Sequence, residues 1–117
     1  MIPGISDNTT AALQASLQGL DTRAAAIKNN IANVETPGYQ SQVVNFEDSL
    51  RSALADGNPD AATASMSYST APTRLNGNNV SIDNEMTDLT QTELKQQLAV
   101  SALNAKYRLL RTAITGN

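Results

Sequence analysis

Residues 10–34 read TAALQASLQGLDTRAAAIKNNIANV, and this stretch decides the fold class. Its apolar side chains recur at alternating steps of four and three residues over three heptads. That spacing places them on one stripe and is typical of a helix that pairs with another helix. We predict a helix over about 10–34, with its N-cap among residues 6–10, because Pro37 and Gly38 end the pattern. Its pairing stripe consists of Leu13, Leu17, Leu20, Ala24, Ile27, Ile31 and Val34.

The other end of the chain predicts a second long helix over about 84–115, with Ser81 or Asp83 as its N-cap. This helix carries two apolar rows roughly 160° apart. The first row, the predicted seam, is interrupted by Glu93 and Gln96 and contains Ile82, Met86, Leu89, Val100, Leu103, Tyr107, Leu110 and Ile114. The second row contains Leu94, Leu98, Ala102, Ala105 and Leu109. One apolar face suffices for a helix pair, so the second row predicts contact with another molecule; a partly exposed row of good helix formers is the alternative.

The segment between the helices holds three of the four prolines and three of the six glycines. It predicts one short helix, capped by Asn45 and stopped at residues 56–59, with extended pieces near 40–44 and 64–69 and a mobile loop over the rest of 60–79. We therefore predict a mainly α fold, with two long terminal helices in a coiled-coil-like pair around a short helix and an irregular, partly extended middle. The expected division is 1–39, 40–80 and 81–117 within one structural unit.

The composition argues against catalysis and against metal binding. The chain has no His and no Cys, so the commonest general base, thiolate nucleophiles and the usual zinc ligands are absent. Glu47 and Asp48 lie where a helix N-terminus favours negative charge, and so do Asp83, Glu85 and Asp88. We predict no catalytic, cofactor-binding or metal site and no cofactor; a cell-wall glycan hydrolase using paired carboxylates is the enzymatic rival. A net charge of −3 with scattered Lys and Arg also argues against nucleic acid and against a polybasic membrane segment.

The end of the first helix carries a specific motif, NNIANVETPGY at residues 29–39. Ile31 and Val34 belong to the stripe, while Asn30 and Asn33 flank it and can hydrogen-bond a neighbouring helix or the departing chain. The motif closely resembles the N-terminal signature of flagellar rod, hook and related axial proteins; an ordinary Asn-rich helix end is the alternative. The resemblance implies an assembly motif made of Asn29, Asn30, Ile31, Ala32, Asn33, Thr36, Pro37, Gly38 and Tyr39.

Two further stretches, NFEDSL at 45–50 and GNNVSIDNEM at 77–86, resemble proximal-rod members of the flagellar basal-body rod family. The sister proximal-rod type shares the Asn-Ile-Ala-Asn motif and stays possible. The resemblance implies a structural subunit rather than an enzyme, one that polymerises through its terminal helices into the rod that transmits torque.

The implied partners are other rod subunits, further copies of the chain, the membrane ring, the adaptor between ring and rod, and the type III export apparatus; neither nucleic acid nor a small-molecule substrate is expected. Residues 1–7 lack the basic and apolar regions of a secretory signal, which by itself favours a cytoplasmic protein or one exported by a route that does not use such a signal. The resemblance implies export to the periplasmic basal body without a cleaved signal peptide. A cytoplasmic coiled-coil adaptor or export chaperone is the remaining rival.

Overall fold

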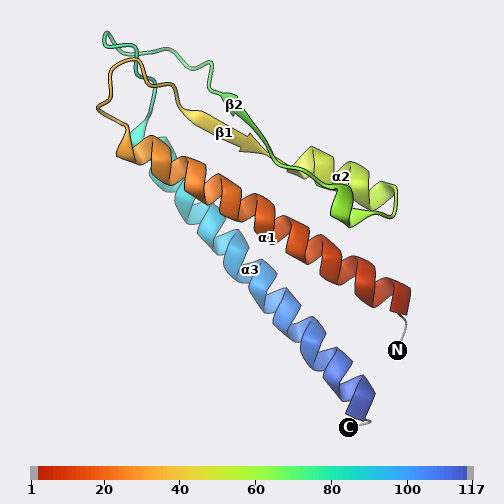
Figure 1. The fold of residues 1–117 in the computed structure, drawn as a ribbon. Helices are drawn as coiled ribbons and strands as arrows, with labels where there is room; N and C mark the ends of the chain where they lie inside the picture. Colours follow the sequence, from red (N-terminus) through yellow and green to blue (C-terminus); the bar gives the residue numbers. More distant parts are fainter. Residues whose placement is uncertain (1–2, 116–117) are drawn as a thin grey trace.

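The computed structural model describes residues 3–115 and consists of two long helices beside a small central region (Figure 1). The elements in chain order are α1 (Pro3–Ala32), β1 (Gln42–Asn45), α2 (Glu47–Ala55), the short 3₁₀ helix η1 (Pro59–Ala61), β2 (Ser65–Tyr68) and α3 (Ile82–Thr115). The predicted class, a mainly helical chain with paired terminal helices and a partly extended middle, is confirmed.

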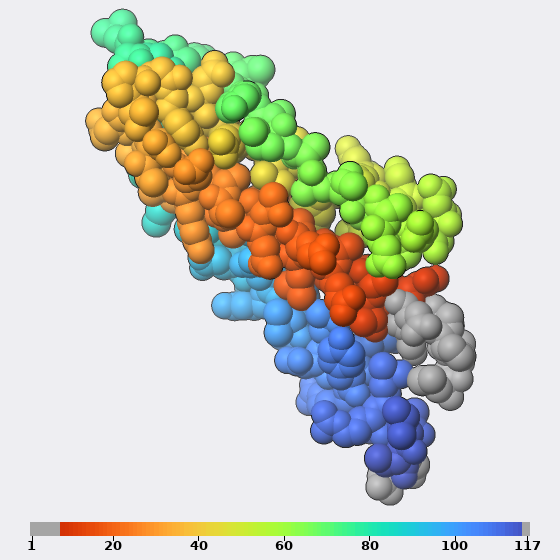
Figure 2. Space-filling view, viewed as in Figure 1, coloured from red at the N-terminus to blue at the C-terminus, as the bar shows by residue number. Residues whose placement is uncertain are grey.

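Helix α1 forms the middle layer of a flat, elongated molecule. Helix α3 runs antiparallel along one side of α1, while β1, β2 and α2 line its other side (Figure 1). The Cα atoms extend over 64 × 27 × 14 Å, so few side chains lie far from a surface. In the space-filling view α3, in blue, forms one edge of the molecule along most of its length (Figure 2). Within residues 3–115, α1 is the only element against which α3 packs extensively.

The core of the helix pair is thin because its members are small. Leu20, Ala24 and Ile27 of α1 are buried together with Ala99 and Leu103 of α3. No Trp is present and the only Phe lies outside this pair, so each helical turn buries little apolar area. The pair therefore depends on polar contacts as well as on burial.

Two cross-helix hydrogen bonds set the register of α1 against α3. Asn30 Nδ2 donates to Glu85 Oε2 at 3.1 Å, and Gln96 Nε2 donates to Asp21 Oδ1 at 2.7 Å. Because the helices are antiparallel, these two contacts determine which residues of α1 and α3 lie level with each other along the pair.

Helix α1 begins earlier and ends earlier than its apolar stripe indicates. It starts at Pro3, so the predicted N-cap among residues 6–10 is wrong; proline is well tolerated in the first helical position because it needs no intrahelical donor there. It ends at Ala32 rather than at Val34. The following residues form a turn, in which the Thr36 N–H donates to the Asn33 carbonyl at 3.0 Å.

The other helix starts also differ in detail. Helix α3 begins at Ile82, and the Asn84 N–H donates to Ser81 Oγ at 3.4 Å, so Ser81 is the N-cap rather than Asp83. Helix α2 has Phe46 in its cap position without a side-chain cap bond. The predicted cap Asn45 is wrong by one residue, because it is the last residue of β1.

Helix α3 turns a different face toward α1 than the predicted seam. Leu89, Gln96, Leu103 and Leu110, spaced by seven, are buried or half-buried. Buried Glu85, Thr92 and Ala99 complete that face. This corresponds to a rotation of α3 by roughly 50°, half the angle between successive residues. The other seam members stay exposed: Ile82 at 41%, Met86 at 52%, Val100 at 45%, Tyr107 at 46% and Ile114 at 78%.

Strands β1 and β2 form an antiparallel pair in which Val44 lies opposite Met66. Their positions confirm the extended pieces expected near 40–44 and 64–69. Val44 is buried, whereas all four residues of β2 are exposed. After β1, the ring of Phe46 packs against Gly19 of α1 and is 7% exposed. This contact fixes α2 beside α1.

Candidate functional site

Two stretches that are distant in sequence, 29–42 and 74–85, meet at one end of the helix pair in a hydrogen-bonded cluster. We call this cluster the joint. Its side chains are Asn30, Ser41, Arg74, Asn78, Asn79 and Glu85. In the part of the chain that the structure describes, no buried side-chain nitrogen or oxygen lacks a hydrogen-bond partner. The joint is thus a complete polar network, the form in which buried polar groups add rigidity.

Asn30 is the centre of the joint and is 0% exposed. Its Nδ2 donates to the Gln42 carbonyl at 2.9 Å and to Glu85 Oε2 at 3.1 Å. Its Oδ1 accepts from the Gln42 N–H at 2.8 Å and from the Tyr39 hydroxyl at 2.9 Å. An amide side chain offers two donors and two acceptor sites, so Asn30 uses its whole capacity. It ties α1 to β1 and to α3 at a single point.

Glu85 continues the network from α3. The carboxylate is 8% exposed; its Oε1 accepts from Ser41 Oγ at 2.8 Å while Oε2 accepts from Asn30. The Ser41 N–H in turn donates to Asn79 Oδ1 at 2.7 Å. A buried carboxylate is tolerated only when its oxygens are hydrogen-bonded, and here neutral donors serve that purpose.

Asn78 and Arg74 satisfy the carbonyl groups where α1 ends. Asn78 is 0% exposed, and its Nδ2 donates to the Asn33 and Thr36 carbonyls, both at 2.9 Å. Arg74 Nη2 donates to the Val34 carbonyl at 2.6 Å. These three carbonyls belong to the turn that follows α1, so the two side chains hold the chain where it leaves the helix.

The backbone comes closest between the two halves of the joint at Gly38 and Gly77. The Gly38 N–H donates to the Asn76 carbonyl at 2.8 Å, and both glycines have positive φ, 76° and 83°. A Cβ on Gly77 would lie 3.2 Å from Gly38 Cα. Glycine at 77 therefore meets two demands, an unusual backbone conformation and close backbone contact.

Tyr39 lies beside the joint, and its hydroxyl donates to Asn30 Oδ1 at 2.9 Å. Partial burial, followed by the charges of Glu85 and Tyr68, raises the pKa of the Tyr39 hydroxyl. The phenol therefore stays protonated at physiological pH and remains a donor to Asn30.

Arg23 holds a second contact, farther along α1. Its Nη2 donates to the Val44 carbonyl and to Glu47 Oε2, both at 2.8 Å, and its guanidinium lies 4.8 Å from the centroid of the Phe46 ring. Partial burial raises the pKa of Glu47, but the hydrogen bond from Arg23, the backbone N–H bonds and the Arg23 charge outweigh it. The net result is a pKa below the usual 4.5.

The lowered pKa of Glu47 predicts acid sensitivity. Its stabilising contribution is complete above the unfolded pKa and is lost as the pH falls through the lower folded pKa. Glu47→Gln should therefore flatten the loss of stability below about pH 4.5 by less than about 1 kcal/mol, since the carboxylate is nearly half exposed. Urea unfolding at pH 7 and pH 3 measures this difference. In an Arg23→Met background the same substitution should no longer change it; an unchanged effect would contradict the assignment to Arg23.

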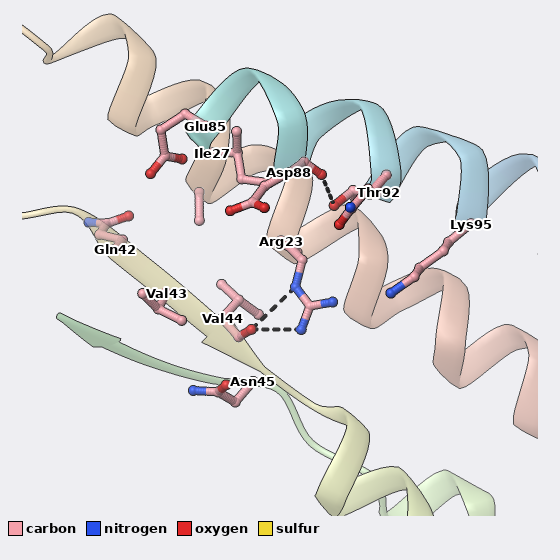
Figure 3. A pocket seen from close by; sticks show the side chains of 12 residues that line it. Arg23, Ile27, Gln42, Val43, Val44, Asn45, Glu85, Asp88, Thr92 and Lys95 are labelled. Atoms are coloured by element: carbon pink, nitrogen blue, oxygen red, sulfur yellow. Dashed lines mark hydrogen bonds between the residues drawn. The ribbon is translucent and has the colours of Figure 1, made fainter. Parts of the chain in front are cut away.

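A cleft of about 260 Å³ opens between β1 and the beginning of α3, with α1 as its floor (Figure 3). Ile27 and Val44 supply apolar surface, Asp88 and Lys95 lie along the α3 wall, and Arg23 is already bonded to Val44. Among the described residues no group of three or more acidic side chains is placed to hold a metal ion. The side chains that line this cleft are suited to packing and hydrogen bonding.

Several large apolar side chains of α3 are exposed to solvent. The predicted second row contributes Leu94 at 56%, Leu98 at 62% and Leu109 at 66% exposure. Monomeric proteins seldom leave a continuous apolar row of this kind open to water, and such rows commonly mark interfaces. Across residues 3–115, no helix combines the length and apolarity needed to cross a bilayer.

No protein-family model matches the chain. The flagellar basal body rod protein FlgB of Bacillus subtilis (strain 168) is 32% identical, over 89% of this chain and 91% of that protein. The chain belongs to the FlgB family of flagellar basal body rod proteins. FlgB of Escherichia coli (strain K12) is 26% identical over 95% of this chain and 99% of its own length, and FlgB of Cereibacter sphaeroides is 28% identical over 82% and 85%. The resemblance predicted from the sequence is confirmed, and the family is FlgB rather than the sister proximal-rod type FlgC.

In this FlgB-family chain the predicted assembly motif divides into two parts. Asn30, Gly38 and Tyr39 lie in or beside the joint, and Ile31 is half-buried in the helix pair. Asn29, Ala32, Thr36 and Pro37 are exposed, as is Gly38, and Asn33 is half-buried. Within the α1 stripe, Leu20, Ala24 and Ile27 are buried. The role of these residues in assembly stays a prediction.

Sequence reasoning missed several side chains on which the FlgB fold depends. Glu85 looked like one of three acids favoured by the helix dipole, and residues 76–79 lay within the predicted mobile loop. Gly19 was given no role in the sequence analysis, although glycine within a helix usually weakens the helix. One signal was available: a glycine inside a strong heptad pattern indicates a close neighbour, which here is Phe46.

Proposed function

We propose that this FlgB-family chain is a structural subunit of the proximal rod of the bacterial flagellar basal body. Its terminal helices polymerise into the shaft that transmits torque. The uncovered row of α3 carries the proposal, because Leu94, Leu98 and Leu109 point away from α1 and need a partner outside the chain. The half-exposed seam residues Met86, Val100 and Tyr107 add a second surface of the same helix.

The shape of the subunit supports head-to-tail packing. A flat molecule with unlike faces makes contacts that do not close on themselves, and such contacts generate rings or helical assemblies. The joint ties α1, β1 and α3 together at one end, so a load on α3 passes to the rest of the subunit through hydrogen bonds rather than through a flexible linker. Neither feature requires an enzymatic site.

The neighbours we propose are further copies of this chain, other rod subunits, the membrane ring and the adaptor that joins the ring to the rod. The type III export apparatus is a transient partner, and the final location is the periplasmic part of the basal body. The division into 1–39, 40–80 and 81–117 serves assembly in this proposal: the outer parts build the shaft, and the middle part buttresses α1.

The decisive experiment deletes the gene in its host, complements it with the full chain, and examines motility and purified basal bodies by electron microscopy. We expect non-swimming cells whose membrane rings carry no rod, with recovery on complementation. Swimming cells with complete rods would overturn the proposed function, and a cytoplasmic adaptor or export chaperone would take its place.

A charge in the helix pair should block assembly. Leu103 is 8% exposed against α1, so Leu103→Glu buries an unpaired carboxylate and should abolish rod formation while the cells still synthesise the chain. Basal-body microscopy and immunoblots of whole cells measure the two quantities. Asn104→Asp, an added charge at the next, exposed position, is the control and should leave rods intact. Normal rods in the Leu103 variant would count against the packing described here.

A further inference from the structure

Four charged side chains of the long helices form two matching pairs. In α1, Asp21 precedes Lys28 by seven residues, and in α3, Asp88 precedes Lys95 by seven residues. All four are exposed. Among the side chains that the structure describes, the ion pairs are Arg23–Glu47 and Arg51–Asp48, so none of these four charges has a counter-ion among those side chains. Seven residues are two helical turns, which places each pair on one face of its helix.

The two pairs lie on opposite faces of the flat subunit. Asp88 and Lys95 of α3 line the cleft, and Arg23 and Ile27 of α1 form part of its floor (Figure 3). Lys28 instead lines an open groove along α1 together with Ala25 and Ala32. At about 100° per residue, the α1 residues of the cleft and those of the groove point to roughly opposite sides of the helix.

The pairs are also level along the long axis. In the register set by Asn30–Glu85 and Asp21–Gln96, Lys28 is level with Asp88, and Asp21 is level with Lys95. A second copy in the same orientation, displaced sideways without axial shift, presents its α1 antiparallel to the first copy's α3. Both acid–base pairs then meet at once, whereas a parallel alignment of the two helices would oppose like charges.

We propose that the groove face of one copy, carrying Asp21 and Lys28 on α1, docks on the cleft face of a second copy, carrying Asp88 and Lys95 on α3. The inference rests on the proposed function, for which it names the partner and the register of one subunit contact. Ala25 and Ala32 leave room for the neighbouring helix, because small residues let helices approach closely. The contact is heterologous, because it joins the groove face of one copy to the cleft face of the next. The first copy keeps a free cleft face and the second a free groove face, so further copies can add at both ends.

Cysteine cross-linking in assembled rods tests the register directly, because the natural chain contains no cysteine. Two tagged full-length chains, Lys28→Cys and Asp88→Cys, are co-expressed in the deletion strain and oxidised. We expect a heterodimer with both tags and none from either chain alone. Lys28→Cys with Glu93→Cys, whose position lies about 140° around α3 from Asp88, is the matched control and should give none. Swimming cells without the Lys28–Asp88 heterodimer would overturn the register while leaving the proposed function standing.

Charge exchange gives a second, independent readout. The α1 exchange (Asp21→Lys with Lys28→Asp) and the α3 exchange (Asp88→Lys with Lys95→Asp) each keep the net charge at −3. Either exchange alone turns two attractive pairs into two repulsive ones and should reduce rod-bearing basal bodies about tenfold. All four substitutions together should restore them, which a folding defect at Asp21 could not do. Failure of this rescue contradicts the proposal, while complete rods in the deletion strain contradict the function itself.

Discussion

Asn30→Ala is expected to lower the free energy of unfolding by more than about 3 kcal/mol. The substitution removes all four hydrogen bonds of a fully buried amide. It leaves Glu85 Oε2 and the Gln42 backbone groups without their Asn30 partner where water cannot easily replace it, and unpaired buried groups of this kind cost about 1–3 kcal/mol each. Urea unfolding followed by circular dichroism at 222 nm measures the loss.

Two further variants separate hydrogen bonding from packing at this position. Asn30→Asp keeps the shape of the side chain but removes both donors and sets a carboxyl group against Glu85, so we expect it to be at least as damaging as alanine. Asn29→Ala, at the exposed neighbouring position of the same motif, should cost less than about 1 kcal/mol. If Asn30→Ala behaved like Asn29→Ala, the joint would not stabilise the fold.

Gly19→Ala is expected to destabilise the chain by about 1–3 kcal/mol although alanine is the better helix former. A Cβ at position 19 would lie 2.4–2.6 Å from three ring carbons of Phe46, far inside normal contact. Those atoms lie near the base of a buried ring in the turn between β1 and α2, so the ring cannot move aside cheaply. The gain of about 1 kcal/mol in helix propensity is smaller than the expected cost of overpacking.

The sign of this effect is its sharpest test. In a Phe46→Ala background the ring is gone, so Gly19→Ala should become stabilising by up to about 1 kcal/mol, the helix-propensity term alone. Gln18→Ala, at the exposed neighbouring position, should change stability by less than about 0.5 kcal/mol in either background. A Gly19→Ala chain that is more stable than the parent with Phe46 in place would refute the contact.

The features predicted correctly from the sequence are those with a local physical cause. The spacing of Leu13 to Val34 fixes a helix because helical geometry repeats every 3.6 residues, and Ser81 caps α3 through its own hydroxyl. The rotation of α3 escaped prediction because Glu85 and Thr92 look like solvent-facing residues. They are buried because Asn30 and Ser41 reach Glu85 across the chain, and because the Thr92 hydroxyl bonds its own helix at the Asp88 carbonyl. Such long-range partners leave no periodic trace in one sequence.

In the candidate site, too, features with a local cause were predicted and those that depend on distant residues were not. The motif at 29–39 was found as a pattern, but its chemistry became visible only with the second stretch beside it. Asn78 shows the difference: it lies in the segment predicted as a mobile loop, yet its amide donates to the carbonyls of Asn33 and Thr36, more than 40 residues earlier in the chain. The exposed second row of α3 was predictable because two apolar rows on one helix are a property of that helix alone.

The meeting of Gly38 and Gly77 has a consequence for how this architecture can vary. The segment between these two residues starts and ends at one place, with the Gly38 N–H bonded to the Asn76 carbonyl, while β1 and α2 within it pack along α1. In topological terms the intervening segment is an insertion whose ends already touch. Lengthening such a segment costs little additional loop-closure entropy. We expect that a longer arm, or a whole foreign domain with adjacent termini, can be grafted there as a cassette without shifting α1 against α3.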